Sequence, residues 1–233
     1  MRALAEALHD KGFEIFVPIL SGHGSSVEQL KITPTKAWIE DALKAFERVA
    51  SGSPRHIFVA GLSFGGLLAL MLSGRFSTKI SGVACLSSPF LLRKSRIELL
   101  MSCFSLLPEV ALNLLPTVDK PKRRLGIFSA PRYCFSKHSI GSVARMFKLR
   151  KAVVDSSISL SAPVLIMQDP NDHHLSSIAP YRFRAFCKAP NKISWVVDGE
   201  HELTLGPASR EVIQEVVYFF TSLIEAESSC PER

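Results

Sequence analysis

The sequence predicts one α/β domain in which a mostly parallel sheet is flanked by helices. Three observations lead to this class. Short apolar runs alternate along the chain with longer stretches of amphipathic helical periodicity. The apolar runs lack polar alternation, which is typical of parallel strands that are covered on both faces. With 233 residues, 47% of them hydrophobic, the chain is long enough to bury one such core.

The expected strands are short, aliphatic and often β-branched. They fall at residues 13–18, 57–60, 80–86, 164–167 and 193–197. The expected helices carry apolar residues at intervals of three and four. They fall at residues 3–9, 35–50, 65–72 and 210–224. Because strands alternate with helices in this order, we expect parallel strands joined by helical crossovers.

The alternation is interrupted between residues 87 and 161. This stretch has helical pieces, prolines that include Pro108, Pro116 and Pro121, and basic clusters at 93–96 and 120–124. We interpret it as an insertion between two strands of the sheet. The predicted division is therefore a core and an insertion, with the core at 1–89 and 160–233 and the insertion at 90–159.

The basic charge belongs to the insertion. The chain carries a net +7, but the segment from Phe90 to Lys151 holds 13 Lys or Arg against three acidic residues, a net +10, and the remainder is −3. A nucleic-acid partner is not expected, because the segment shows no aromatic-interleaved or zinc-type module. Contact with an anionic lipid surface and a merely solvated surface both remain open.

The cysteines and the absence of long apolar runs bear on the compartment. Five scattered cysteines without metal-type spacing argue against a disulfide framework and fit a reducing, cytoplasmic location. No run of 18 apolar residues and no signal peptide after Met1 is recognisable, so neither a transmembrane helix nor a leader is expected. No cofactor and no metal ion is expected.

A serine flanked by glycines follows a predicted buried strand and precedes a predicted helix. The residues Gly61-Leu62-Ser63-Phe64-Gly65 match the G-x-S-x-G pattern. At such a turn the backbone is strained, and we expect Gly61 and Gly65 to keep side chains out of the crowded elbow. The Ser63 Oγ is then exposed, and the N–H of Phe64 points at an oxyanion site. The alternative is an ordinary turn rich in Gly and Ser.

A serine nucleophile needs a histidine base held by a carboxylate. The sequence Asp169-Pro170-Asn171-Asp172 follows the strand at 164–167, and His201 follows the strand at 193–197. Ligand-binding groups gather at the carboxyl ends of parallel strands, so an acid and His201 are expected beside Ser63. Both Asp169 and Asp172 fit the acid role; a turn before Pro170 is the structural alternative for Asp169.

The other histidines are weaker candidates for a catalytic or metal-binding role. His173 and His174 adjoin the acid, but no further ligand cluster supports a metal site, so we interpret them as part of a solvated loop. His23, between Gly22 and Gly24, is expected to be a turn residue near the site. For His201 itself, a capping or core role is the alternative to a base.

Four motifs together resemble the bacterial carboxylesterase and monoacylglycerol lipase group of the α/β-hydrolase superfamily, within the Hydrolase_4 or serine-aminopeptidase-like family. They are G-H-G at 22–24, G-L-S-x-G-G at 61–66, P-V-L-I-x-Q followed by Asp four residues after Gln168, and G-x-H before the last helix. The resemblance implies acyl transfer through a serine acyl-enzyme, with Ser63, Asp172 and His201 as the triad. It favours Asp172 over Asp169, and it implies that the insertion is a helical lid.

The front of the chain departs from this family. A further strand and a His-Gly loop, which supplies the second oxyanion donor, should precede the helix at 3–9. We expect truncation rather than a degenerate relative, because the triad residues are intact. A chain without that loop is expected to be poorly stable and weakly active, since one oxyanion donor is worth about 10²–10³ in rate.

Two function classes follow. The first is a serine hydrolase of carboxylic esters, such as a carboxylesterase or monoacylglycerol lipase, with amidase or peptidase activity as a variant. The second is a non-catalytic or truncated relative that acts as a binding protein. In the first class, the apolar stretch at 97–115 is expected to line an acyl pocket.

Overall fold

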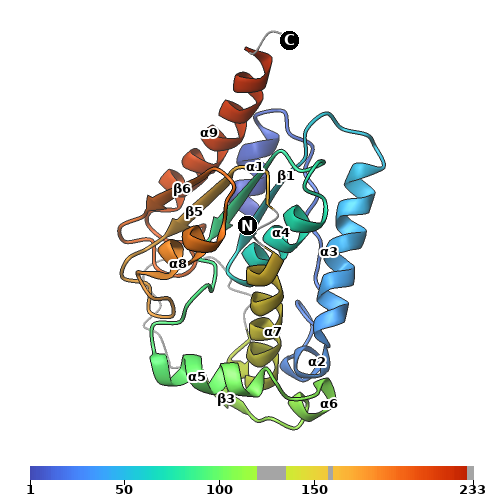
Figure 1. Cartoon of the computed structure of the whole chain (residues 1–233), viewed down its shortest axis with the longest axis vertical. Helices are drawn as coiled ribbons and strands as arrows, with labels where there is room; N and C mark the ends of the chain where they lie inside the picture. The colour runs from blue at the N-terminus through green and yellow to red at the C-terminus, as the bar shows by residue number, and fades with distance from the viewer. Residues whose placement is uncertain (120–134, 157–159, 230–233) are drawn as a thin grey trace.

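The computed structural model describes residues 1–119, 135–156 and 160–229 (Figure 1). Its main sheet has four parallel strands in the order β1-β2-β5-β6. These are β1 (Phe58–Leu62), β2 (Gly82–Leu86), β5 (Val164–Gln168) and β6 (Asn191–Trp195). The predicted parallel α/β sheet is confirmed, and four of the five expected strands are present within two residues of their predicted bounds.

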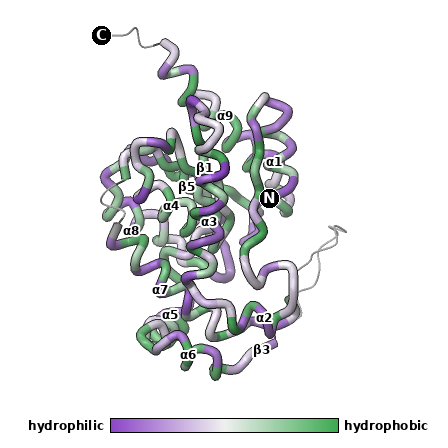
Figure 2. Tube along the Cα trace, turned by 90° about the vertical axis from the view of Figure 1, so that its right-hand side faces the viewer, coloured by the Kyte–Doolittle hydropathy of each residue, from purple (hydrophilic) through white to green (hydrophobic). Residues whose placement is uncertain are grey.

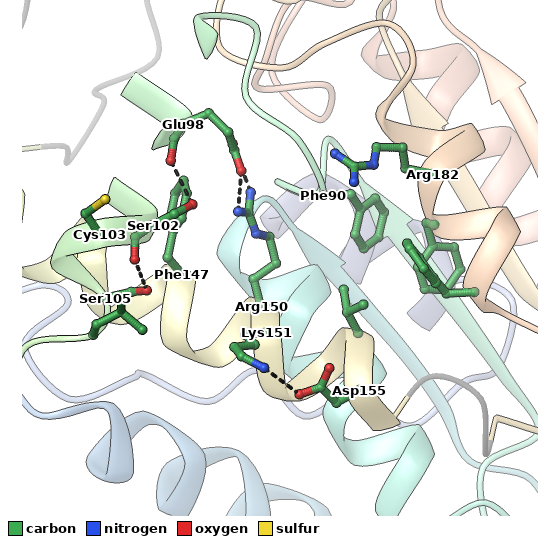
Figure 3. Close-up of a pocket in the computed structure, with 14 residues that line it drawn as sticks. Phe90, Glu98, Ser102, Cys103, Ser105, Phe147, Arg150, Lys151, Asp155 and Arg182 are labelled. Carbon is green, nitrogen blue, oxygen red and sulfur yellow. Dashed lines mark hydrogen bonds and ion pairs between the residues drawn. The ribbon is translucent and has the colours of Figure 1, made fainter. Parts of the chain in front are cut away.

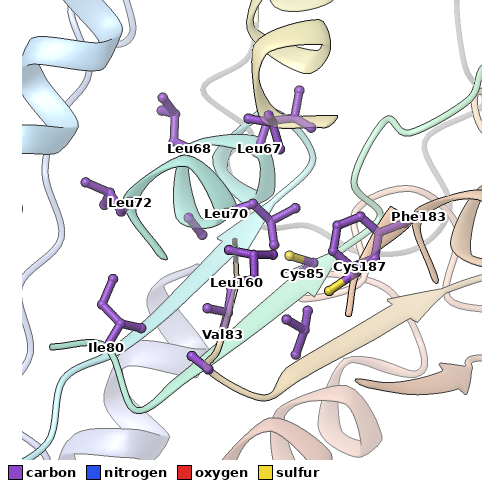
Figure 4. Close-up of a cluster of buried hydrophobic side chains, with 14 of the residues drawn as sticks. Leu67, Leu68, Leu70, Leu72, Ile80, Val83, Cys85, Leu160, Phe183 and Cys187 are labelled. Carbon is purple, nitrogen blue, oxygen red and sulfur yellow. The ribbon is translucent and has the colours of Figure 1, made fainter. Parts of the chain in front are cut away.

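Alternate residues of the central strands face two separate hydrophobic clusters. In β2, Val83 and Cys85 join one cluster, whereas Ala84 and Leu86 join the other. The first cluster is covered by α3 (Thr35–Ala50), α4 (Phe64–Arg75) and α8 (Ala179–Phe186), as Figures 1 and 4 show. The second is covered by α1 (Arg2–His9) and α9 (Ser209–Ser228). Both faces of the sheet are therefore buried, as the unbroken apolar runs predict.

The helix α3 is amphipathic, so one of its faces is buried and the other carries polar side chains. In α3, Trp38, Ala42 and Phe46 are buried at intervals of four, which leaves the charged side chains on the opposite face. Figure 2 shows the contrast: the trace is largely hydrophobic in the central strands and α4, and is more hydrophilic along α1 and α3. The helix α4 is apolar on nearly all sides because it lies between the sheet and α3 and α7.

One expected strand is absent. Residues 13–20 are not part of the sheet, and β1 pairs with β2 alone among the described strands. The apolar side chains of this segment pack against the core although the segment is not a strand. Phe13 and Ile15 pack against the cluster under α1 and α9, and the Phe13 ring meets Phe58 edge-on at 5.8 Å. The prediction of a strand at 13–18 is therefore wrong, since burial of alternate side chains does not require ladder hydrogen bonds.

The predicted insertion lies between β2 and β5 in the chain. Its described part holds α5 (Ser95–Phe104), α6 (Glu109–Leu112), the antiparallel pair β3 (Thr117–Asp119) and β4 (Lys137–Ser139), and α7 (Ile140–Ser156). Another helix, α2 (Val27–Ile32), contacts α7 and β4. The sequence did not predict the β3–β4 pair. The basic cluster at 120–124 lies outside the described residues.

A buried arginine joins the insertion to the rest of the molecule. Arg145 on α7 is 1% exposed, and its Nε lies 2.6 Å from a carboxylate oxygen of Glu109. Its other nitrogens donate to the Asn113 side chain, to the Glu109 carbonyl and to the Lys31 carbonyl. A guanidinium is tolerated in such a place only because nearly all its N–H groups find acceptors. Arg145 is thus a structural tie and not part of a basic surface.

The apolar stretch at 97–115 is amphipathic. Met101 and Leu112 are buried, whereas Leu99, Leu106 and Leu114 are 68%, 79% and 82% exposed. That this stretch lines an acyl pocket stays a prediction. Among residues 1–119, 135–156 and 160–229, no helix combines the length and the apolar character that crossing a membrane needs.

Candidate active site

The chain turns sharply from β1 into α4 at Ser63. The backbone of Ser63 has φ +52° and ψ −117°, a conformation that costs a non-glycine residue free energy. Its N–H donates to the carbonyl of Leu86 at the end of β2, which holds the turn against the sheet. Such strain is typical of a side chain that must be presented at a fixed place. The predicted strand–serine–helix context is present.

The turn is most crowded at Gly61 and Gly66. A Cβ on Gly61 would lie 2.1 Å from the carbonyl carbon of Gly65, and one on Gly66 would lie 1.8 Å from the Ser88 Oγ. A Cβ on Gly65 would meet nothing within 4 Å. The prediction that Gly65 must lack a side chain for steric reasons is therefore wrong. The crowded position is Gly61, where the backbone of Gly65 leaves no room for a Cβ. The sequence pattern contains Gly66 but gave no reason to single it out.

These contacts predict opposite outcomes for two alanine substitutions. Gly61→Ala should lower the free energy of unfolding by about 3 kcal/mol, the upper range for overpacking, because backbone must move to admit the methyl group. Gly65→Ala should stay within about 1 kcal/mol of the unchanged chain, since it sits in the first turn of α4 with open space around it. Urea unfolding of the two variants measures the difference, and equal losses would contradict it.

Three side chains from three strand ends form one hydrogen-bonded chain. The Nε2 of His201 lies 3.0 Å from the Oγ of Ser63, and its Nδ1 lies 2.7 Å from Oδ2 of Asp172. An ionised carboxylate only accepts hydrogen bonds, so Nδ1 carries the proton and Nε2 is left to accept from the serine hydroxyl. The structure thus brings together the three residues that the sequence singled out.

The Asp172 carboxylate is held ionised. The group is fully buried, and burial acts to raise its pKa. The hydrogen bond and charge of His201, together with the backbone N–H groups of His174 and Leu175 on Oδ1, outweigh burial and lower the pKa of Asp172 below its usual value. All of its hydrogen bonds are thus made to the charged form, which suits a group that orients an imidazole.

Asp169 has a different position. It is 3% exposed, and its two carboxylate oxygens accept from the backbone N–H groups of Asn171 and Glu200 at 2.7 and 2.8 Å. The contact with Asn171 is the local turn that was the structural alternative for Asp169. The contact with Glu200 ties the loop that carries Asp172 to the loop that carries His201. Asp169 does not hydrogen-bond the imidazole in this structure.

The loop at 22–24 lies beside the elbow. The His23 ring is parallel to the Phe64 ring at 6.1 Å, and Trp38 meets the Phe64 ring edge-on at 4.9 Å. The Trp38 indole also donates to the Ser21 carbonyl at 2.9 Å, which fastens this loop to α3. Burial lowers the pKa of His23, although the Ser21 carbonyl and Asp41 act in the other direction. His23 is therefore a neutral packing residue at neutral pH.

Phe64 is the first residue of α4. As the first residue of the helix it has no carbonyl one turn earlier to bond, so its N–H is available to an anion beside Ser63. The positive end of the helix dipole adds to this preference. The candidate oxyanion donor named from the sequence is therefore at a position where a developing negative charge is stabilised.

Two contacts near the site were not predicted from the sequence. Arg93, in the first basic cluster, donates from Nη1 to the backbone carbonyl of Asp172 at 2.9 Å, and its own N–H donates to the His174 carbonyl. The His174 ring meets the His201 ring edge-on at 5.0 Å. Arg93 thus braces the acid loop from the start of the insertion. The sequence carries no local signal for either contact, because each joins residues whose separation along the chain is large.

No metal centre accompanies these groups in the described part of the chain, where three or more His, Cys, Asp or Glu nowhere gather in an arrangement that suits a metal ion. A parallel sheet with a strained serine elbow and histidine and aspartate loops at the same edge defines the α/β-hydrolase class of fold. Residues 1–205 match the Hydrolase_4 family, described as "Serine aminopeptidase, S33". The chain belongs to this family.

Known relatives agree with that placement. A thermostable monoacylglycerol lipase from Bacillus sp. (strain H-257) is 36% identical over 73 residues, which are 31% of this chain and 29% of the lipase. The match thus spans under a third of that relative's length. Solved structures extend over far more of the chain. One, reported for the metagenome-derived lipolytic enzymes LipS and LipT, has a TM-score of 0.79 at 18% identity and covers 95% of this chain and 87% of its own.

A second solved structure, the monoacylglycerol lipase of Paleococcus ferrophilus, has a TM-score of 0.76 at 18% identity and covers 95% of this chain and 88% of its own. A third, a soluble variant of monoglyceride lipase from Saccharomyces cerevisiae, has a TM-score of 0.67 at 15% identity, with coverage of 87% and 75%. At these identities the likeness establishes the α/β-hydrolase fold.

Proposed function

We propose that this protein is a serine hydrolase that cleaves carboxylic esters of small molecules, with monoacylglycerols among its substrates. The observation that carries the proposal is the unbroken hydrogen-bond chain from buried Asp172 through His201 to the Oγ of Ser63. A serine hydroxyl becomes a useful nucleophile only when a base accepts its proton as it attacks. The three residues have the order and the contacts that this chemistry needs.

The proposed reaction has two halves. In the first, the Oγ of Ser63 attacks the ester carbonyl carbon while Nε2 of His201 takes the hydroxyl proton. The tetrahedral oxyanion accepts a hydrogen bond from the N–H of Phe64, and Asp172 stabilises the imidazolium. His201 then gives its proton to the leaving alcohol as the carbon–oxygen bond breaks, which leaves an acyl group on Ser63. In the second half, water activated by His201 releases the acid and restores the hydroxyl.

The insertion at 90–159 is proposed as the cap of this site, above a core made of 1–89 and 160–233. Its first residues already contact the acid loop: Arg93 bonds the Asp172 carbonyl, and Leu92 forms an antiparallel bridge with Leu175. A segment anchored this close to the triad can shape what reaches Ser63. The ester preference itself is taken from the lipolytic relatives that the chain resembles.

Contact of the insertion with anionic lipid remains a prediction. Several cations of the segment are occupied internally: Arg145 and Lys148 pair with Glu109, and Arg150 pairs with Glu98. Lys94 and Arg96 are exposed and remain candidates for such a contact. The second cluster, at 120–124, lies outside the described residues.

A substrate panel tests the proposed function. The chain is incubated with a monoacylglycerol, a p-nitrophenyl ester and an aminoacyl p-nitroanilide of matched side-chain size, and release of acid, phenol or aniline is followed. We expect ester cleavage to exceed anilide cleavage. Labelling of the protein by a fluorophosphonate, located by peptide mass spectrometry, is the companion measurement, because it requires an activated serine. Dominant anilide cleavage would favour the amidase variant. No labelling and no turnover would favour a binding protein.

A further inference from the structure

A cavity of about 470 Å³ lies apart from the triad, between α5, α7 and α8 (Figure 3). Residues from these three helices line it, together with Phe90 from the loop that follows β2 and with Ser105 and Leu106, which follow α5. Ser63, Asp172 and His201 are not among its lining residues. The volume lies within the range in which proteins hold small organic ligands.

The floor of the cavity is aromatic and buried. The rings of Phe90 and Phe183 are stacked with their centroids 4.6 Å apart, and both residues are buried. Phe147, on α7, is 2% exposed and carries the guanidinium of Arg150 over its ring at 3.9 Å. At the rim, Phe186 is 41% exposed. Leu106, which also lines the cavity, is 79% exposed. The apolar surface open to a ligand is therefore mainly that of Phe186 and Leu106, above buried aromatic rings.

Among the charged residues that line the cavity, one cation has no ion-pair partner in the described part of the chain. Glu98 pairs with Arg150, and Lys151 pairs with Asp155 at 3.1 Å. Arg182 is exposed and lines the same cavity from α8, and none of the ion pairs between described residues includes it. Figure 3 shows its guanidinium beside Phe90, directed toward the middle of the lining side chains. The cavity thus combines an aromatic floor with a single unpaired positive charge.

We propose that this cavity binds an amphiphilic carboxylate of the fatty-acid type. The carboxylate would take two parallel hydrogen bonds from Arg182, and the hydrocarbon chain would lie on Phe186 and Leu106, the lining side chains with exposed apolar surface. A singly charged head matches the one free cation, whereas a phosphate dianion would leave excess negative charge beside Glu98 and Asp155. Acids released by the proposed ester hydrolysis fall in this class, but binding here does not depend on that activity.

Cys103 provides a reporter that is independent of Ser63. It is exposed and lines the cavity, whereas Cys85 and Cys187 are buried. Burial raises the pKa of the Cys85 thiol to about 12, so this thiol stays unreactive. The rate at which N-ethylmaleimide modifies Cys103 in the full chain is measured by peptide mass spectrometry, which separates it from the other cysteines. Decanoate is the probe, and decanol of equal chain length is the uncharged control.

Decanoate is expected to slow modification of Cys103, with decanol having less effect at equal concentration. Arg182→Gln should raise the decanoate concentration that gives half-protection by roughly tenfold, because a charge-assisted hydrogen bond is lost. Arg184→Gln is the matched control: the residue lies two positions further along α8, is exposed and does not line the cavity. It should leave protection unchanged. Phe186→Ala should weaken protection without removing the charge preference.

Three results of the protection experiment would each overturn the proposal, and a fourth comes from labelling Ser63. The first three are no protection by decanoate, equal protection by decanol and decanoate, and equal protection in the Arg182 and Arg184 variants. The modification rate without ligand must be the same in all variants, and their thermal melting must match that of the unchanged chain. Prior labelling of Ser63 with a fluorophosphonate should not alter protection at Cys103. Loss of protection after that labelling would place the ligand at the triad instead.

Discussion

Replacement of Ser63 by alanine is expected to lower p-nitrophenyl ester hydrolysis to below about 0.1% of the unchanged chain, because the only covalent route of the proposed mechanism is removed. Fluorophosphonate labelling at this position should vanish with it. The measurement is initial rate at saturating ester, with the active protein normalised by a folded-state signal. Retained activity above a few per cent would show that another group performs the chemistry.

A second substitution at the same position separates lost chemistry from lost stability. Ser63→Gly also removes the hydroxyl, but glycine adopts φ +52° without the steric cost that serine and alanine bear. This variant should be as inactive as the alanine variant and should be more stable than both alanine and serine forms, by about 1 kcal/mol. If the glycine variant were instead less stable, the backbone at the elbow would not be under strain.

The second large effect is expected at Asp172. Asp172→Asn should lower kcat by about 10⁴-fold, because an amide can donate to Nδ1 and thereby favours the tautomer in which Nε2 carries the proton. That tautomer cannot accept the proton of Ser63. The effect should appear in kcat far more than in KM, since Asp172 is fully buried and is expected to touch no substrate.

Asp169→Asn is the matched control for that experiment. The substitution is chemically the same, the residue is three positions away in the same loop, and it is 3% exposed. Its carboxylate accepts from two backbone N–H groups, so an amide loses one acceptor and stability should fall by about 1–3 kcal/mol. Turnover per folded molecule should change by about tenfold or less. A larger kcat loss at Asp169 than at Asp172 would transfer the acid role to Asp169.

Much of the fold can be predicted from the sequence, because the patterns that indicate each helix or strand lie within that element. The apolar runs that become β2 and β5, and the four-residue spacing of Trp38, Ala42 and Phe46, each lie within one element. The serine elbow is predictable for the same reason: strand, turn and helix are contiguous. Residues 13–18 show the limit, since an apolar run specifies burial and does not specify which backbone, if any, it pairs with.

The choice between Asp169 and Asp172 was not readable from the residues alone. Both follow β5, and both could turn the chain. Family resemblance favoured Asp172, and the tertiary structure gives the physical difference: Oδ2 of Asp172 faces His201, whereas Asp169 faces two backbone N–H groups. A side chain's direction within a loop depends on the loop across from it, which lies some 30 residues further along the chain.

The sequence by itself determined the class of sheet, the strained serine turn and the candidates that could meet at one sheet edge: Ser63, His201 and one of two aspartates. Only the tertiary structure decided which glycine is crowded, which aspartate faces the imidazole and which cations are free. Gly66 is crowded by Ser88, Arg145 is ion-paired with Glu109, and Arg182 has no carboxylate partner among the described residues. Each outcome depends on residues that are distant along the chain. Local patterns specify elements, whereas steric fit and charge pairing depend on how those elements pack.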